Sequence, residues 1–282
     1  DLDVAIWYQH IVSYREDVAL AQRHGLSRIG GDAFVDGVLG AAMSPGVMRA
    51  ALFEPYFDDP STRGDLLFQD EEIEKFVCLS RQAGLQFSAH AVGDRAIAQL
   101  MTAYEKALRK KPGDARFRIE HATLPHPSWL PKAAELGVIF SMQPAFDHYS
   151  GGPEGRYAKR VGPRRAHLTN PFQDTLKAGV MIVGGSDSPV NPIDPIFGMH
   201  CMVNHHYPEQ RTSRLEALKA FTSNPAFSVF EEDRKGKLEE GKQADLAILS
   251  TNPLSADPLK VKDIRVAMTI RRGKIIFRSP DF

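Results

Sequence analysis

The sequence has few cysteines, no long apolar run and no excess of charge. Its two cysteines, Cys78 and Cys201, are far apart and outside any C-x-x-C spacing, so neither a disulfide framework nor a thiolate zinc site is predicted. No segment approaches the roughly 18 apolar residues that span a bilayer. Thirty-five basic residues balance thirty-five acidic ones. These absences argue against nucleic acid and membranes as partners.

The start of the chain also lacks two features. It opens at Asp1 without an initiator methionine, and no basic start followed by an apolar run marks a signal peptide. We therefore expect a truncated chain whose native N-terminus lies upstream of Asp1, and a cytoplasmic location. With 282 residues, of which 43% are hydrophobic, the chain is long enough for a large domain with a small companion.

Strand-like apolar runs alternate with amphipathic segments, a pattern typical of α/β architecture with parallel strands. The expected strands are 4–8, 31–35, 85–90, 116–121, 138–142 and 180–187. The expected helices are 15–24, one beginning near residue 70, 94–110, 128–136 and 171–178. Six strand-then-helix units are two short of a closed (β/α)8 barrel. We predict an incomplete TIM-like barrel that lacks the first two units.

Two further parts of the chain depart from this alternation. The segment 146–170 is rich in Gly, Pro, Tyr and Arg, and it is long enough to be a substrate loop. Helices at 215–221 and 225–230 then precede short strands at 245–250, 264–270 and 274–277. The predicted division is a partial barrel over residues 1–230 and a small β-structure over 231–282. Open strand edges in such a barrel favour pairing with another copy, so a homo-oligomer is expected.

Three polar residues end three separate predicted strands: His90, His121 and Asp187. In a (β/α)8 barrel the carboxyl ends of the strands converge on one face, where active sites are built. Imidazole and carboxylate groups suit zinc and related divalent ions. The alternative interpretation is that each histidine is a hydrogen-bonded structural residue, which is the commoner role of a lone histidine at a strand end.

The residues around these positions point to a family. The segments His90–Ile97, Arg118–Ala122 and Gly185–Val190 resemble the family-3 branch of the amidohydrolase superfamily, which includes formamide deformylases. The resemblance continues in the same order through Asp36-Gly37, Pro55-Tyr56, Gln143-Pro144, 231–236 and 237–246. It covers nearly the whole chain from Gly31 onward. It implies a metal-dependent hydrolase barrel followed by the C-terminal part of a composite β-sandwich.

The resemblance also implies roles for individual residues. His90 and His121 become metal ligands of the fifth and sixth barrel strands, and Asp187 becomes the eighth-strand aspartate. In this family that aspartate touches the metal, takes a proton from the attacking water and can return it to a leaving amine. The implied cofactor is a divalent metal, with zinc expected.

The chain departs from the family pattern in two places. No His-x-His pair precedes a barrel start, so the chain enters the pattern at about the third strand. Many relatives have a lysine four residues before the Asp-Gly pair, where this chain has Asp32. Asp32 is either a shorter carboxylate ligand or a residue that caps a strand end.

Metal-bound imidazoles usually donate their second N–H to an oxygen acceptor. The candidates for this role are Glu120, Gln143 and Asp94. Asp94 has a second interpretation, because a carboxylate in the first turn of a helix favours the helix dipole. Asp36 and Gly37 lie on a loop that could line the pocket.

The resemblance therefore implies a small-molecule substrate and hydrolysis of its C–N bond, in an amide, formamide or cyclic amide, by metal-activated water. We expect this activity in the full-length protein, with this chain inactive as a fragment. The alternative is a non-catalytic binding or regulatory protein that keeps the scaffold, which the missing His-x-His pair motivates. The substrate, the metal count and the oligomeric state do not follow from the sequence.

Overall fold

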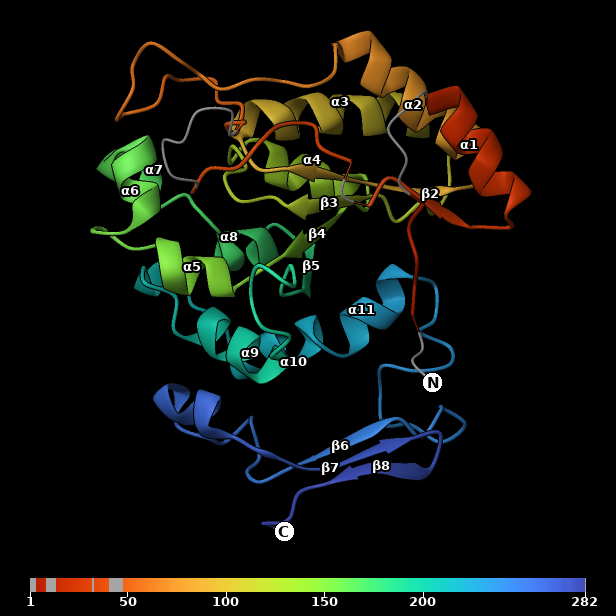
Figure 1. Cartoon of the computed structure of the whole chain (residues 1–282), viewed down its shortest axis with the longest axis vertical. Helices are drawn as coiled ribbons and strands as arrows, with labels where there is room; N and C mark the ends of the chain where they lie inside the picture. The colour runs from red at the N-terminus through yellow and green to blue at the C-terminus, as the bar shows by residue number, and fades with distance from the viewer. Residues whose placement is uncertain (1–3, 9–13, 32, 41–47, 282) are drawn as a thin grey trace. The chain divides into compact units, whose positions relative to one another are not determined.

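The computed structural model describes residues 4–8, 14–31, 33–40 and 48–281, in two compact units (Figure 1). The first unit comprises Asp1–Met142 and Tyr149–Ile182, and the second comprises Gln143–His148 and Val183–Phe282. None of the helices in the described ranges is long and apolar enough to cross a membrane.

A five-stranded sheet follows the chain order β1-β2-β3-β4-β5. Its strands are β1 (Arg28–Ile29), β2 (Gln86–Ala91), β3 (Arg118–His121), β4 (Ile139–Met142) and β5 (Met181–Gly184). The first four pair in parallel, with His90 opposite Glu120 and Ala91 opposite His121. Strands separated by helices and paired in parallel confirm the predicted α/β class.

Two expected strands are shorter than the sequence predicts. The run 4–8 contributes a single parallel bridge from Tyr8 to Ile29, and the run 31–35 a single bridge from Phe34 to His90. The predictions of full strands there were wrong. Gly30 and Gly31 have positive φ values of 96° and 62°, which break the extended backbone just before Phe34.

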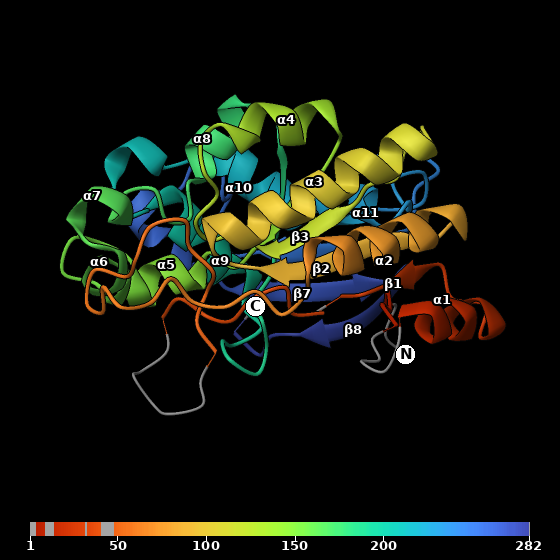
Figure 2. The same cartoon turned by 90° about the horizontal axis from the view of Figure 1, so that it is seen from above.

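Helices cover one face of this sheet. In Figures 1 and 2, α2 (Asp70–Gln82) and α3 (Asp94–Lys110) lie side by side. α2 begins as predicted, because three acidic residues occupy its first turn and Glu72 forms a capping box with Gln69. The other helices of the first unit are α1 (Tyr14–Arg23), α4 (Trp129–Glu135), α6 (Arg156–Val161), α7 (Pro163–Ala166) and α8 (Phe172–Lys177).

Aromatic side chains join these helices to the sheet. Phe87 on β2 packs edge-on against Phe76 of α2, with ring centroids 4.9 Å apart. Tyr104 of α3 lies 4.7 Å from Phe117, just before β3. Phe87, Tyr104 and Phe117 are almost fully buried, and each such side chain contributes about 2–3 kcal/mol through burial. Phe87 therefore marks the helix-covered face of β2, and Gln86, Ser88 and His90 alternate to the opposite face.

The segment 146–170 contains three short helices, although the sequence predicted a loop. They are α5 (Ala145–Ser150), α6 and α7. Glycines separate the last two from their surroundings: Gly155 precedes α6, and Gly162, with φ 79°, lies between α6 and the Pro163 that opens α7. The Gly and Pro content marks helix ends here.

The second unit contains helices and a small antiparallel sheet. Its strands β6 (Leu246–Leu249), β7 (Val266–Arg271) and β8 (Lys274–Arg278) pair in that order. The predicted small β-structure is thus present. The helices are α9 (Pro195–Val203), α10 (Arg214–Ala220) and α11 (Ser223–Ser228), with 3-10 turns η1 (Pro208–Gln210) and η2 (Pro258–Asp263).

Helix α9 has no counterpart among the predicted elements. Its sequence is apolar almost throughout, so it shows no alternation of polar and apolar faces. Asp194 caps it by accepting a hydrogen bond from the Phe197 backbone N–H at 2.9 Å, and Pro195 follows at the first helical position. The capping residue Asp194 and the proline after it were the only local sequence signals that indicated this helix.

Candidate metal centre

His90 lies in β2, one residue before the strand ends, with its side chain 2% exposed. Its backbone is held on both sides: its N–H donates to Ala33 at 3.0 Å and its carbonyl accepts from Val35 at 2.9 Å. The ring of Phe34 lies 4.3 Å from the imidazole, centroid to centroid. The imidazole is therefore fixed by neighbours before any ligand binds.

His121 is the last residue of β3 and is also buried. Strand alternation would send its side chain to the same face as Ala91, its register partner, which is the helix-covered face. Its φ of 72° is left-handed and ends the extended backbone. The two imidazole rings instead lie 4.5 Å apart at an angle of 69°. A left-handed non-glycine residue costs on the order of 1 kcal/mol, and such residues are uncommon.

A buried carboxylate, Asp36, adjoins His90. It accepts hydrogen bonds from the backbone N–H groups of Ala51 (2.8 Å), Val92 (3.0 Å) and Gly93 (2.8 Å). His90 Nε2 lies 3.7 Å from its Oδ1 and 3.2 Å from the carbonyl oxygen of Gly37. Burial raises the pKa of Asp36 to about 6, although His90 and the three N–H groups act to lower it. The sequence predicted only that Asp36 and Gly37 could line a pocket.

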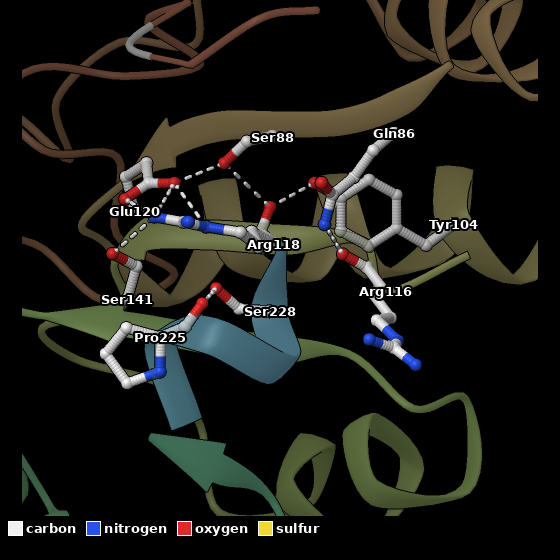
Figure 3. A network of polar contacts seen from close by, with 9 residues as sticks. All are labelled: Gln86, Ser88, Tyr104, Arg116, Arg118, Glu120, Ser141, Pro225 and Ser228. Atoms are coloured by element: carbon white, nitrogen blue, oxygen red, sulfur yellow. Dashed lines mark hydrogen bonds and ion pairs between the residues drawn. The ribbon is translucent and has the colours of Figure 1, made fainter. Parts of the chain in front are cut away.

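Glu120 belongs to a separate polar network on the face of the sheet opposite the helices (Figure 3). Arg118 donates to both of its carboxylate oxygens at 3.0 Å, and Ser88 donates to Oε1. Arg118 also donates to Ser141 at 2.8 Å, and its guanidinium lies 4.4 Å from the Trp7 ring. The contacts of this carboxylate are thus with a guanidinium and a hydroxyl group.

The remaining predicted residues lie in different places. Asp94 opens α3 and accepts from the Phe53 N–H at 2.9 Å, and burial raises the pKa of its carboxyl group. Gln143, in the second unit, is buried and directly follows β4. Asp187, also in the second unit, is half-buried three residues beyond β5, with a left-handed φ of 59°. Asp32 lies outside the described residues.

The donor chemistry of the first unit suits a transition metal. Two buried imidazoles at the ends of neighbouring parallel strands are suitable ligands for zinc. Within the described residues, no three histidine, cysteine, aspartate or glutamate side chains form a group that could hold a metal ion. The described part of the first unit therefore supplies a pair of candidate ligands.

Solved structures of other proteins share this fold. An uncharacterised metal-dependent hydrolase from Pyrococcus furiosus aligns over 87% of this chain and 50% of its own, with 32% identity and a TM-score of 0.68. A second one, from Pyrococcus horikoshii, aligns over 88% of this chain and 51% of its own, with 29% identity and a TM-score of 0.71. The fold is thus that of metal-dependent hydrolases.

Sequence comparison is more specific. A model of the amidohydrolase family, of the family-3 type, matches residues 9–277. The chain belongs to this amidohydrolase family, as the motifs predicted. The Bacillus subtilis protein YtcJ is 29% identical over 87% of this chain, and the N-substituted formamide deformylase of Arthrobacter pascens is 25% identical over 74% of it. The matches cover 46% and 40% of those two proteins, so this chain spans about half the length of its curated relatives.

Proposed function

We propose that the full-length protein hydrolyses a C–N bond in an amide, formamide or cyclic amide. Family membership supports hydrolysis in general, and one relative is named an N-substituted formamide deformylase. The observation that carries the proposal is the His90–His121 pair, whose rings lie 4.5 Å apart because the backbone of His121 turns at the end of its strand. Buried side chains gathered at such strand ends are typical of barrel active sites.

In this proposal His90 and His121 hold a divalent metal, with zinc as the expected ion, and the sequence motifs assign Asp187 and Asp32 as further candidate ligands. When bound, such a metal lowers the pKa of a water molecule so that it can attack an amide carbonyl at neutral pH. Asp187 accepts the proton of the attacking water and returns it to the leaving amine. The motif Gly185–Val190, which resembles that of the family, supports this role.

We further propose that the protein forms a homo-oligomer.

The test of the function is the Asp187→Asn variant of the full-length gene product, assayed on a panel of formamides, amides and cyclic amides. We expect turnover to fall by at least about a thousandfold, because the amide cannot accept a proton. The circular dichroism spectrum should not change. Asp233→Asn, at an exposed position of the same unit, is the matched control and should retain full turnover. Undiminished activity of Asp187→Asn would rule out the assignment.

Metal analysis separates the hydrolase from a non-catalytic binding or regulatory protein. Plasma mass spectrometry of the full-length product should find at least one zinc or similar ion per chain. A metal-free, correctly folded full-length product with no turnover on the panel would support the non-catalytic alternative.

A further inference from the structure

We propose that Asp36 and the carbonyl group of Gly37 together position His90, by holding its imidazole in the tautomer that carries its proton on Nε2. This inference rests on the proposed metal-dependent function, because a fixed tautomer would serve to present His90 to a metal. The tautomer itself can be measured in the metal-free protein. Asp36 would act through His90 and not on the substrate.

The tautomer follows from the hydrogen-bond partner. A carbonyl oxygen can only accept, so the 3.2 Å contact between His90 Nε2 and the Gly37 oxygen requires a proton on Nε2. Nδ1 then carries the lone pair that a metal would bind. Ligand histidines in metalloproteins are commonly oriented in this way, by an oxygen acceptor on the second ring nitrogen.

The carboxylate of Asp36 strengthens this arrangement in two ways. Its Oδ1, 3.7 Å from Nε2, is too far for a hydrogen bond, but it places negative charge beside the N–H group. Its bonds to Val92 and Gly93 also tie down the chain directly after β2, and its bond to Ala51 adds a third backbone segment. Asp36 therefore ties these backbone segments together beside the His90 imidazole.

The backbone packing leaves little room for the carbonyl of Gly37 to move. A Cβ added at Gly37 would lie 2.1 Å from the Met48 carbonyl oxygen, and one added at Gly93 would lie 2.1 Å from that of Ala51. Val38 pairs with Arg49 in a parallel bridge. Glycine is thus required at both Gly37 and Gly93, where two backbone segments approach closely. The Gly37 carbonyl group, which accepts the His90 proton, is therefore part of a rigid backbone junction.

This assignment differs from the sequence-based one, which considered Glu120, Gln143 and Asp94 as acceptors for the ligand histidines. Glu120 bonds to Arg118 and Ser88, and Asp94 to the backbone of Phe53. Asp36 is the carboxylate near the Nε2 atom of His90.

The primary test is nitrogen-15 and carbon-13 NMR of the metal-free full-length wild-type protein at about pH 8, where an ordinary histidine is neutral. Assignment of the His90 ring uses the His90→Gln spectrum. We expect the Nε2–H tautomer as the main form, with a slowly exchanging Nε2 proton because the side chain is 2% exposed. A predominant Nδ1–H tautomer in the folded wild type would overturn the proposal, whatever the variants do.

The second test compares Asp36→Asn with Asp58→Asn, a carboxylate of the same unit whose partner is the Arg160 side chain. Zinc binding is measured by competition with a chromophoric chelator. Asp36→Asn should mix the His90 tautomers and weaken zinc binding by about 10- to 100-fold. Asp58→Asn should keep the tautomer and stay within about threefold of the wild type. Equal behaviour of the two folded variants would refute the role of Asp36.

The outcomes separate this inference from the proposed function. If the full-length wild-type protein binds no zinc but His90 carries its proton on Nε2, the metal site is refuted and the tautomer assignment stands. If zinc binds but His90 carries its proton on Nδ1, the metal site stands, and the positioning role of Asp36 and the Gly37 carbonyl group is wrong. If Asp36→Asn does not fold, the wild-type tautomer decides.

Discussion

The two units each contain a buried aspartate, and the pKa values of the two carboxyl groups shift in opposite directions. In the first unit Asp36 is 0% exposed and is surrounded by backbone N–H groups, and burial raises its pKa to about 6. In the second unit Asp147 is 1% exposed and lies between two imidazoles, with His205 Nε2 at 3.0 Å and His206 Nδ1 at 3.1 Å. Burial also acts to raise the pKa of Asp147, but its histidine partners outweigh burial and lower it.

The comparison shows that partners, and not burial alone, decide the charge of an interior carboxylate. Backbone dipoles around Asp36 offset only part of the cost of removing a charge from water. Two imidazoles within hydrogen-bond distance offset more. The backbone of Tyr207 also contacts His205: its N–H donates to Nδ1 at 3.0 Å and its carbonyl oxygen lies 3.3 Å from the same atom, while Nε2 lies 3.0 Å from the Asp147 carboxylate.

The largest expected effect is on the second unit. Asp147→Ala should lower its free energy of unfolding by about 3–4 kcal/mol, because the fully buried His205 loses its carboxylate partner. Urea denaturation followed by circular dichroism measures the change. Asp263→Ala removes an exposed carboxylate 3.8 Å from Lys260 and should cost at most about 0.5 kcal/mol. Equal midpoints for the two variants would show that the His–Asp cluster adds no stability.

The pH dependence should have opposite signs in the two regions. The folded pKa of Asp36 is raised, so the native state holds a proton that the unfolded chain releases between about pH 3.8 and 6. Stability from Asp36 is therefore present at low pH and lost as the pH rises through this window. The stability difference between wild type and Asp36→Asn should be about 2 kcal/mol larger at pH 4.5 than at pH 7, in the presence of a chelator.

For Asp147 the sign reverses, because a lowered pKa gives stability above the unfolded pKa that is lost as the pH falls below it. The difference between wild type and Asp147→Asn should shrink below about pH 3.8. If both aspartates showed the same trend in these denaturation series, the contrast between the two environments would be wrong.

The smallest effect is expected within the cluster itself. The side chain of His206 is 38% exposed, whereas that of His205 is fully buried. His206→Gln should cost less than about 1 kcal/mol, since solvent can replace part of its contact with Asp147. His205→Gln should cost about 2 kcal/mol, because a buried hydrogen-bonded group is changed. Urea midpoints at pH 7 compare the two, and a larger loss for His206→Gln would contradict the assigned burial.

The sequence patterns located most elements of the molecule. Strong local sequence signals mark three elements that the structure contains: the acidic first turn of α2, the apolar run of β2 and the amphipathic pattern of α3. The family followed from short motifs around His90, His121 and Asp187, and the family match confirmed it. Helix α9 was missed because a buried helix with no polar face has no helical periodicity to detect.

The candidate site was predictable only in part. Residue type and strand position identified His90 and His121, since strand ends of a parallel sheet meet on one side. The turned backbone of His121 and the contact of His90 with Gly37 were not predictable, because both depend on segments distant in sequence. Asp36 is 54 residues from His90, and nothing local to either residue indicates the other.

Local chemistry along the chain was thus enough to establish the α/β class, the family and the identity of the candidate ligands, because each depends on residue type and short spacing. The pKa shifts of Asp36 and Asp147, the tautomer proposed for His90 and the hydrogen bond between Ser88 and Glu120 came from the folded arrangement. Each depends on burial and on partners brought within a few ångströms by packing, and free energies of that kind are set by three-dimensional neighbours.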